Sequence, residues 1–404
     1  MVVCHEKAIK QNERKQIQMS TPVPDIRTTH EPWSLFFDAI VDRYTLTERP
    51  AALIVSHILP DMLDYLPAFK RLADLAILIG RPHTVDLGTL TRLEALGQRV
   101  NLASRDDTVM FGRIRAAVAG VPAEQRLVLI DMGGYFAPMS PSLVAEYGGR
   151  LAGIVEDTEV GHRRYDANNL PPCPVVSLAR SPFKEGEDWL VGQSIVDSAA
   201  IILRGSRDPL ENAKACVIGY GKIGHSIVDG LLCRGVRPVV FDHNPVRAAI
   251  AAAHGYTVVP TLAQGLRGSR FVFCATGNFA LSRADFTSLD DGAYIISATP
   301  AEDELDLGAV ASWHREEIAD HVSRLSDDEG RSLGLLNDGN AVNFVGHRGY
   351  TAFAHLVQAE MFAAVNLLSN TPPPPTGAIS EVNSEERATI AETWFRTRQS
   401  IPEF

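Results

Sequence analysis

The stretch VIGYGKIGHSIVDGLL, residues 217–232, decides the fold. It begins in an apolar run that predicts a buried strand, passes three glycines spaced G-x-G-x-x-G, and continues with helical periodicity. In a dinucleotide-binding turn the first glycine allows the tight bend and the second lets a pyrophosphate approach the backbone. The third lets the helix pack closely on the strand. We therefore predict a Rossmann domain in which cofactor contacts come from Gly219, Gly221, Lys222, Ile223 and Gly224.

An acidic residue closes the next predicted strand. RPVVFD (237–242) ends in Asp242, 23 residues after Gly219. A carboxylate there accepts hydrogen bonds from the ribose hydroxyls and repels a 2′-phosphate, so NAD is favoured over NADP. Thr276, Gly277 and Asn278 follow a later strand and are further candidates for cofactor contacts. The alternative is a glycine-rich turn with an incidental aspartate.

Apolar runs separated by helical patterns extend this organisation in both directions. Runs at 51–58, 75–82, 126–134 and 151–158 predict parallel strands that are buried on both faces. We therefore expect an α/β protein with two doubly wound Rossmann-like domains, of which the second binds NAD. The expected divisions are a flexible leader (1–30), a substrate and catalytic domain (31–195 plus 350–370), an NAD-binding domain (196–349), and a proline-rich spacer with a short tail (371–404).

Composition limits the classes of partner. The chain has 404 residues, 45% of them hydrophobic, and a net charge of −11, which argues against a nucleic-acid or anionic-membrane partner. Its five cysteines are spread along the chain without a CxxC pair, so neither a disulfide framework nor a metal site is expected. We expect a soluble, cytoplasmic protein with a small-molecule substrate.

Three acid–base candidates lie at or near predicted strand ends in the first domain: His57, Asp131 and Glu156. Parallel strands bring such positions to one edge of a sheet, where the side chains can converge on a cleft. Each has a structural alternative, namely a core histidine, a turn-capping aspartate and a solvated acidic loop.

The ordered motifs resemble those of the S-adenosylhomocysteine hydrolase family. LIDMGGYF resembles its DDGGD segment, GIVEDTEVGHRRY its EETTTG segment, and GQSIVDSAAIIL the helix that leads into its cofactor domain. VIGYGKIGHS, the DHNP run and CATGN match the NAD domain of that family in order and spacing. The similarity spans about residues 50 to 370.

This resemblance implies a redox-assisted elimination. In that family, tightly held NAD oxidises the 3′ hydroxyl of a nucleoside, a base removes the acidified 4′ proton, the 5′ substituent leaves, and the ketone is reduced again. By position, His57 and Asp131 match the acid–base pair at the 5′ carbon, and Glu156 matches a ligand of the substrate sugar. Thr158 matches an NAD contact, and Asn343 the asparagine beside the nicotinamide.

The chain departs from the family around the substrate. The segment with the catalytic lysine falls opposite residues 179–183, where Arg180 is a poor proton carrier, and the nearby Lys184 is our candidate for the missing amine. The threonine and glutamate that hold adenine are replaced by Leu59 and Asp61. Two family histidines fall opposite Pro300 and Tyr350, with His347 nearby. The candidate substrate contacts are therefore Asp61, His347 and Tyr350.

We interpret the chain as a paralogue that applies the same cycle to a different nucleoside-like sugar. Loss of the 5′ hydroxyl without addition of water would make the net reaction a dehydration to a 4′,5′-unsaturated nucleoside. The resemblance also implies a homo-oligomer, although the family's C-terminal lysine-and-tyrosine arm has no counterpart here. The alternatives are authentic S-adenosylhomocysteine hydrolysis, a 2-hydroxyacid dehydrogenase, and a catalytically silent NAD-bound regulator.

Overall fold

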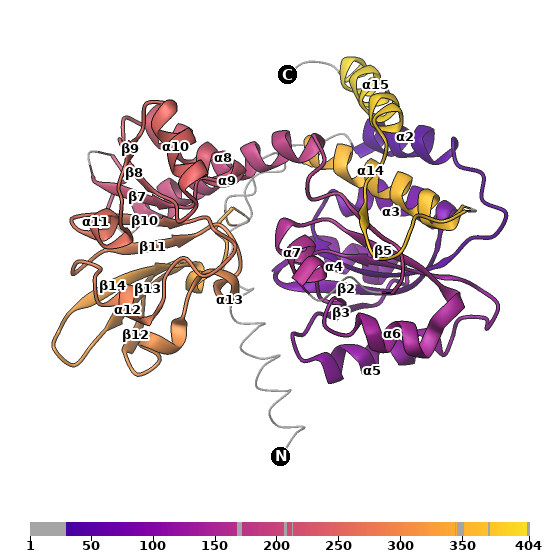
Figure 1. The fold of residues 1–404 in the computed structure, drawn as a ribbon, viewed down its shortest axis with the longest axis horizontal. Coiled ribbons are helices and arrows are strands. Elements are labelled where there is room, and N and C mark those ends of the chain that lie inside the picture. The colour runs from indigo at the N-terminus through magenta and orange to yellow at the C-terminus, as the bar shows by residue number, and fades with distance from the viewer. Residues whose placement is uncertain are drawn as a thin grey trace.

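The computed structural model describes residues 30–167, 172–205, 208–211, 213–343, 345, 351–370 and 372–401. Most of the predicted leader, together with His347 and Tyr350, lies outside the described residues. The described chain forms two α/β lobes, which a long helix connects (Figure 1). The expected fold class, two doubly wound Rossmann-like domains, is confirmed.

The first lobe contains a seven-stranded parallel sheet with the order β15-β6-β5-β4-β1-β2-β3. β1 (Ala51–Ile58) and β4 (Leu127–Asp131) lie at the point where the strand order reverses. The other strands are β2 (Asp74–Val85), β3 (Val100–Leu102), β5 (Leu151–Glu156), β6 (Val175–Ser177) and β15 (Ile379–Ser380).

Helices cover both faces of this sheet because its strands are apolar on both sides. In β1, Ala52 and Ile54 pack into one buried cluster, whereas Leu53 and Val55 pack into another on the opposite face. The helices of the lobe are α2 (His30–Val41), α3 (Met62–Leu72), α4 (Leu87–Ala95), α5 (Asp107–Val118), α6 (Ser140–Tyr147), α7 (Glu159–Ala167), α14 (Thr351–Ser369) and α15 (Ser384–Ser400), with a short 3-10 turn at Gly148–Arg150.

The second lobe contains an eight-stranded sheet with the order β12-β13-β14-β11-β10-β7-β8-β9. It is parallel from β14 to β9, and β12 and β13 add an antiparallel edge. The strands are β7 (Ala215–Ile218), β8 (Val239–Phe241), β9 (Thr257–Val258), β10 (Phe271–Cys274), β11 (Tyr294–Ser297), β12 (His314–Ala319), β13 (Val322–Ser326) and β14 (Ser332–Leu336). The helices are α9 (Lys222–Cys233), α10 (Pro245–Ala253), α11 (Leu262–Leu266), α12 (Arg283–Phe286) and α13 (Ala301–Glu304), with 3-10 turns at Leu307–Val310 and Asn337–Gly339.

Two segments tie the lobes together. Helix α8 (Phe183–Gly205) starts beside the first sheet and packs along α9 of the second lobe, so the predicted boundary at residue 195 falls inside it. Helix α14 packs against α2, α3 and β5 of the first lobe (Figure 1). After the prolines, β15 extends the first sheet and α15 packs on α2, so the tail contributes to this lobe. None of the helices in the described ranges is long and apolar enough to cross a membrane.

Candidate active site

The carboxyl ends of the strands of both sheets border one large cavity. Its volume is about 2760 Å³, several times what a single small ligand requires. The first lobe contributes His57 after the buried part of β1 and Asp157 after β5, and the second lobe contributes Gly219 after β7 and Thr276 after β10. Ligands of open α/β sheets bind at such edges, where the strand order reverses.

The three glycines of the turn after β7 differ in why a glycine stands at each position. Gly219 has a φ of +94°, and a Cβ on Gly224 would lie 1.9 Å from the carbonyl oxygen of Gly219. Gly221 has an ordinary φ of −79°, and nothing lies within 4 Å of the Cβ it lacks. Neither the backbone nor the packing of the described chain therefore requires a glycine at 221. An open position of this kind at the start of a helix fits a pyrophosphate.

Two acidic residues fix the loops of the second lobe that line the cavity. Asp242 accepts hydrogen bonds from the backbone N–H groups of Tyr220 (2.7 Å) and Asn244 (2.8 Å), which locks the end of β8 onto the glycine turn. Glu304, fully buried in α13, accepts from the Thr276 hydroxyl and the Gly277 N–H, both at 2.7 Å. Sequence reasoning missed Glu304, which follows the ISATP segment without any motif of its own.

The other predicted cofactor residues also line the cavity. They are Thr158, Lys222, Ile223, Asn278 and Asn343. Lys222 reaches away from the glycine turn, because its Nζ lies 3.3 Å from the carbonyl oxygen of Ala179 and 3.5 Å from the Asp188 carboxylate. It therefore connects α9 to the start of α8. The structure places these residues at the cavity, and their individual contacts with NAD stay predictions.

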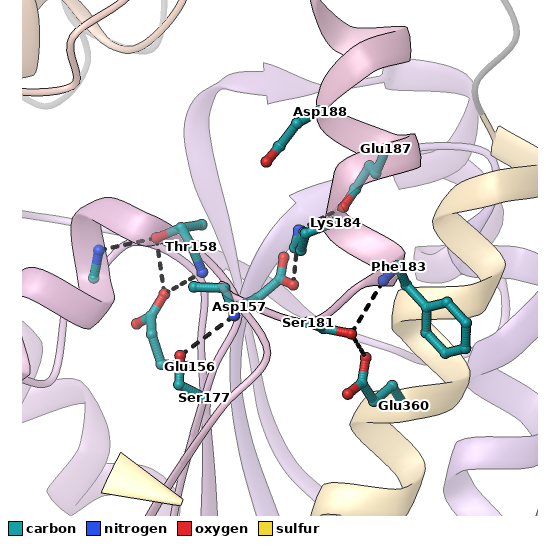
Figure 2. Close-up of polar contacts among 12 residues, drawn as sticks. Glu156, Asp157, Thr158, Ser177, Ser181, Phe183, Lys184, Glu187, Asp188 and Glu360 are labelled. Carbon is teal, nitrogen blue, oxygen red and sulfur yellow. Dashed lines mark hydrogen bonds and ion pairs between the residues drawn. The ribbon is translucent and has the colours of Figure 1, made fainter. Parts of the chain in front are cut away.

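A buried ion-pair cluster faces the cavity from the first lobe (Figure 2). The Nζ of Lys184 lies 2.9 Å from Oδ1 of Asp157 and 2.5 Å from Oε2 of Glu187, and the Lys184 side chain is only 9% exposed. Lys184 and Glu187 are three residues apart on α8, so they share one face of the helix. Sequence reasoning found Lys184 but missed both partners, although the spacing of Lys184 and Glu187 was a usable signal.

The lysine and the carboxyls of the cluster differ in how readily they exchange a proton. Burial alone would lower the pKa of Lys184, but the carboxylates of Asp157, Glu187 and Asp188 outweigh it and raise that pKa above its usual value. Burial raises the pKa of Glu187 to about 7, although Lys184 acts against the increase. The amine is therefore a fixed ammonium, and Glu187 is the group in the cluster that can exchange a proton near neutral pH.

Asp131 and Glu156, both predicted to face the cleft, lie beneath the cavity wall instead. Asp131 accepts from the N–H groups of Tyr135 and Phe136 and from the Tyr165 hydroxyl. Glu156 accepts from Gly133, Gly134 and Thr158.

Both carboxyls are fully buried, and burial raises their pKa values, with Asp131 adding to the effect on Glu156. Their geometry suits the support of turns and not contact with a substrate. At the ends of β4 and β5 it is the next residues, Met132 and Asp157, that reach the cavity.

His57 lies at the cavity wall, half-buried at the end of β1. Its Nδ1 is 2.6 Å from the Thr84 hydroxyl, and its Nε2 is 3.3 Å from a nitrogen of Arg81. Burial, reinforced by the charges of Arg81 and Lys184, lowers the pKa of His57 well below its usual value. The imidazole is therefore neutral at pH 7 and can accept a proton or a hydrogen bond.

The predicted substrate residue Asp61 also lines the cavity, where it accepts a hydrogen bond from the Gln358 side chain of α14. Burial raises the pKa of Asp61. The other two candidates, His347 and Tyr350, lie outside the described residues. The first lobe thus lines the cavity with the carboxyl of Asp61, the amide of Gln358 and the lysine cluster.

Two doubly wound lobes with a glycine-rich turn at a shared cavity define a two-domain, dinucleotide-binding protein of the Rossmann class. The family model described as the S-adenosyl-L-homocysteine hydrolase NAD-binding domain matches residues 189–349. An adenosylhomocysteinase of Thermotoga maritima is 29% identical over 256 residues, 60% of this chain. The chain is thus similar to S-adenosylhomocysteine hydrolases, as the motifs predicted, and its cofactor is NAD.

The match with the Thermotoga maritima protein spans 61% of that protein's own length. Among solved structures, D-mandelate dehydrogenase of Rhodotorula graminis is 11% identical, with a TM-score of 0.44 over 79% of this chain and 94% of its own. The NADPH-dependent glyoxylate/hydroxypyruvate reductase of Sinorhizobium meliloti is 14% identical, with a TM-score of 0.43 over 81% and 96% of the two chains.

Proposed function

We propose that the protein is an adenosylhomocysteinase-like enzyme that uses tightly bound NAD to oxidise a nucleoside sugar transiently and to eliminate its 5′ substituent. The observation that carries this proposal is the position of the Lys184 cluster. Its carboxyl with a pKa of about 7, Glu187, lines the same cavity as the glycine turn of the second lobe. A proton acceptor and a redox cofactor can thus act on one sugar.

The chain's own residues account for the proton transfers. Bound NAD would supply reversible oxidation of the sugar 3′ hydroxyl to a ketone, which acidifies the neighbouring 4′ C–H bond. Glu187 accepts the 4′ proton, the electron pair of that bond forms the 4′,5′ double bond, and the 5′ substituent leaves with the pair of its bond to carbon 5′. The Lys184 ammonium, held by Asp157, stabilises the negative charge that develops during proton removal.

His57 is assigned to the 5′ end of the sugar, where the family resemblance places it. A neutral imidazole beside the leaving group can accept a hydrogen bond or receive a proton during turnover. With the 5′ hydroxyl as leaving group, the proton that Glu187 takes from carbon 4′ leaves with the hydroxide as water. Without addition of water, the product after reduction of the ketone is a 4′,5′-unsaturated nucleoside.

The test begins with the purified protein. Denaturation is expected to release NAD in a ratio near one per chain, and soaking the native protein with nucleosides is expected to raise absorbance in the reduced nicotinamide band. A substrate incubated in deuterated water should exchange its 4′ hydrogen. Bound NAD without reduction or exchange by any nucleoside overturns the proposal in favour of a regulatory protein.

Glu187→Gln separates the two chemical stages. The variant keeps the side-chain volume but cannot take the 4′ proton, so it should still reduce the cofactor while its rate of 4′ exchange falls by a factor on the order of a hundred or more. Glu185→Gln, on the exposed side of the same helix turn, is the matched control. Equal loss of cofactor reduction and exchange in Glu187→Gln would contradict the assigned role.

One observation favours a second candidate, a 2-hydroxyacid dehydrogenase. Arg81 adjoins His57 at the cavity, and an arginine beside a histidine can bind a carboxylate and move a proton. Such an enzyme would bind added NAD reversibly and release NADH in bulk with a 2-hydroxy acid. The same purified protein distinguishes the two, because the proposed cycle returns its cofactor to the oxidised form and releases none.

A further inference from the structure

Arg81 is a buried cation without an acidic partner in the described part of the chain. It lies near the end of β2, is 9% exposed, and lines the cavity. Its one described side-chain contact is the 3.3 Å approach to Nε2 of His57. None of the ion pairs among the described residues includes it, whereas a buried guanidinium normally has an anion beside it.

The hydrogen bonds around His57 fix the direction of this contact. The Thr84 hydroxyl donates to the carbonyl oxygen of Arg81 at 3.2 Å, so its oxygen accepts from Nδ1–H of His57 at 2.6 Å. Nε2 then carries the lone pair and accepts from the guanidinium. Arg81 is held by a neutral acceptor, a weaker partner than an oxyanion.

Two further guanidiniums gather beside Arg81. Arg105 and Arg164 both donate to the carbonyl oxygen of Gly133, at 3.0 and 2.8 Å. The position of a Cβ on Gly133 lies 3.6 Å from the guanidinium carbon of Arg81, so all three cations adjoin this glycine.

Two acidic residues of α13 pair with the other two guanidiniums, Arg105 and Arg164. Asp303 pairs with Arg164 at 2.7 Å, and Glu302 lies 3.8 Å from Arg105. Asp303 also lies within electrostatic reach of Arg81 but makes no contact with it. Of these three guanidiniums, Arg81 is therefore the one that no carboxylate of the described residues contacts, and it lines the cavity.

We propose that Arg81 binds an oxyanion of the substrate, a phosphate or a carboxylate, at the end that adjoins His57. The inference rests on the proposed function and names its substrate class: a nucleoside-type sugar whose 5′ substituent carries an oxyanion and leaves together with it, in place of a free 5′ hydroxyl. A guanidinium binds either oxyanion through two parallel hydrogen bonds. The oxyanion competes with His57 for Arg81, so its arrival also frees Nε2 for proton transfer.

Calorimetric titration of the NAD-loaded protein tests this inference. The ligands are adenosine, adenosine 5′-monophosphate and 5′-(carboxymethylthio)-5′-deoxyadenosine, and at least one of the anionic ligands is expected to bind about tenfold or more tightly than adenosine. Arg81→Gln is expected to lower the affinity for the preferred anionic ligand at least tenfold more than the affinity for adenosine, and Arg81→Lys restores part of the preference. Arg99→Gln, an exposed arginine of the same lobe outside the cavity lining, keeps the full preference.

The two anions distinguish the source of the charge, since the ligand with the larger Arg81-dependent gain carries the recognised group. Equal affinity of the wild-type protein for all three ligands overturns the inference, and so does equal loss of all three in Arg81→Gln. The proposed function fails separately, by absence of cofactor reduction and 4′ exchange, and an Arg81-dependent anion preference would stand without it.

Discussion

Burial of one lysine among carboxylates decides what each residue of the cluster can do. The Lys184 ammonium is 2.9 Å from Asp157 and 2.5 Å from Glu187, so removing its proton would leave buried negative charges unopposed. The proton that can move near neutral pH is therefore on Glu187. We therefore assign the acid–base function to Glu187, which belongs to no family motif. Lys184, the candidate amine, holds the carboxylates around it in position.

The pH dependence of stability tests this assignment. The folded protein holds the Glu187 proton with a pKa of about 7, against an ordinary value of 4.5, so it binds that proton more tightly than the unfolded chain. Its contribution is fully present below pH 4.5 and is lost as the pH rises through about 7.

Urea unfolding at several pH values measures the difference between the wild-type protein and Glu187→Gln. Between about pH 5 and pH 8, we expect the free energy of unfolding of the wild type to fall relative to the variant by an amount on the order of 2–3 kcal/mol. Glu185→Gln should keep the wild-type dependence. A constant difference across this range would show that Glu187 is ionised throughout.

At the scale of the element, the turn between β7 and α9 contains glycines of two kinds, one required by packing and one left open to the cavity. A Cβ at 224 would collide with the Gly219 carbonyl oxygen, whereas a Cβ at 221 would meet only open space. Gly224→Ala should lower the free energy of unfolding by about 3 kcal/mol, because helix and strand must separate. Gly221→Ala should change the stability of the apoprotein by less than about 1 kcal/mol and still lose bound NAD.

The NAD released on denaturation and the urea midpoint of the apoprotein measure the two effects. Gly112→Ala, in α5 with nothing within 4 Å of the added methyl group, is the control for a change from glycine to alanine in a helix. Full retention of NAD by Gly221→Ala would show that the pyrophosphate does not approach this position.

The sequence predicted the central elements because their signals were long and apolar. The run 51–58 coincides with β1, and the segment GQSIVDSAAIIL, expected to be a helix from the family resemblance, is contained in α8. The strands at one edge of the first sheet were not predicted, because β6 has three residues and β15 has two, too few to show a hydrophobic period. The β12–β13 hairpin escaped because β12 is mostly exposed and carries no apolar run.

The sequence located strand ends that border the cavity, but it did not show which residue at each end faces it. Successive residues of a strand face opposite sides, so motif matching located the end of β5 without deciding between Glu156 and Asp157. Three-dimensional packing decides that choice: Glu156 turns to the amides of Gly133 and Gly134, and Asp157 turns to Lys184 (Figure 2). Arg81 gave no signal, because a lone arginine after a strand is usually solvated.

At the scale of the whole molecule, the cavity exists only while both lobes face each other. Helix α8 joins them covalently (Figure 1). An ion pair between Arg164 of α7 and Asp303 of α13 bridges them at 2.7 Å, with the Asp303 side chain 7% exposed. Asp303 also precedes Glu304, which holds the turn after β10. The same short helix therefore supports the cofactor wall and contacts the substrate lobe.

Asp303→Asn keeps the shape of this contact but removes its charge. We expect NAD to dissociate about tenfold faster, equivalent to about 1.4 kcal/mol, because a lobe interface without its ion pair opens more often. The radius of gyration in solution scattering should increase, and higher salt should reduce the difference between variant and wild type. Glu146→Gln breaks the exposed Arg115–Glu146 pair inside the first lobe and should change neither quantity. Unchanged NAD dissociation and radius of gyration in Asp303→Asn would mean that α8 and the packed side chains alone hold the lobes together.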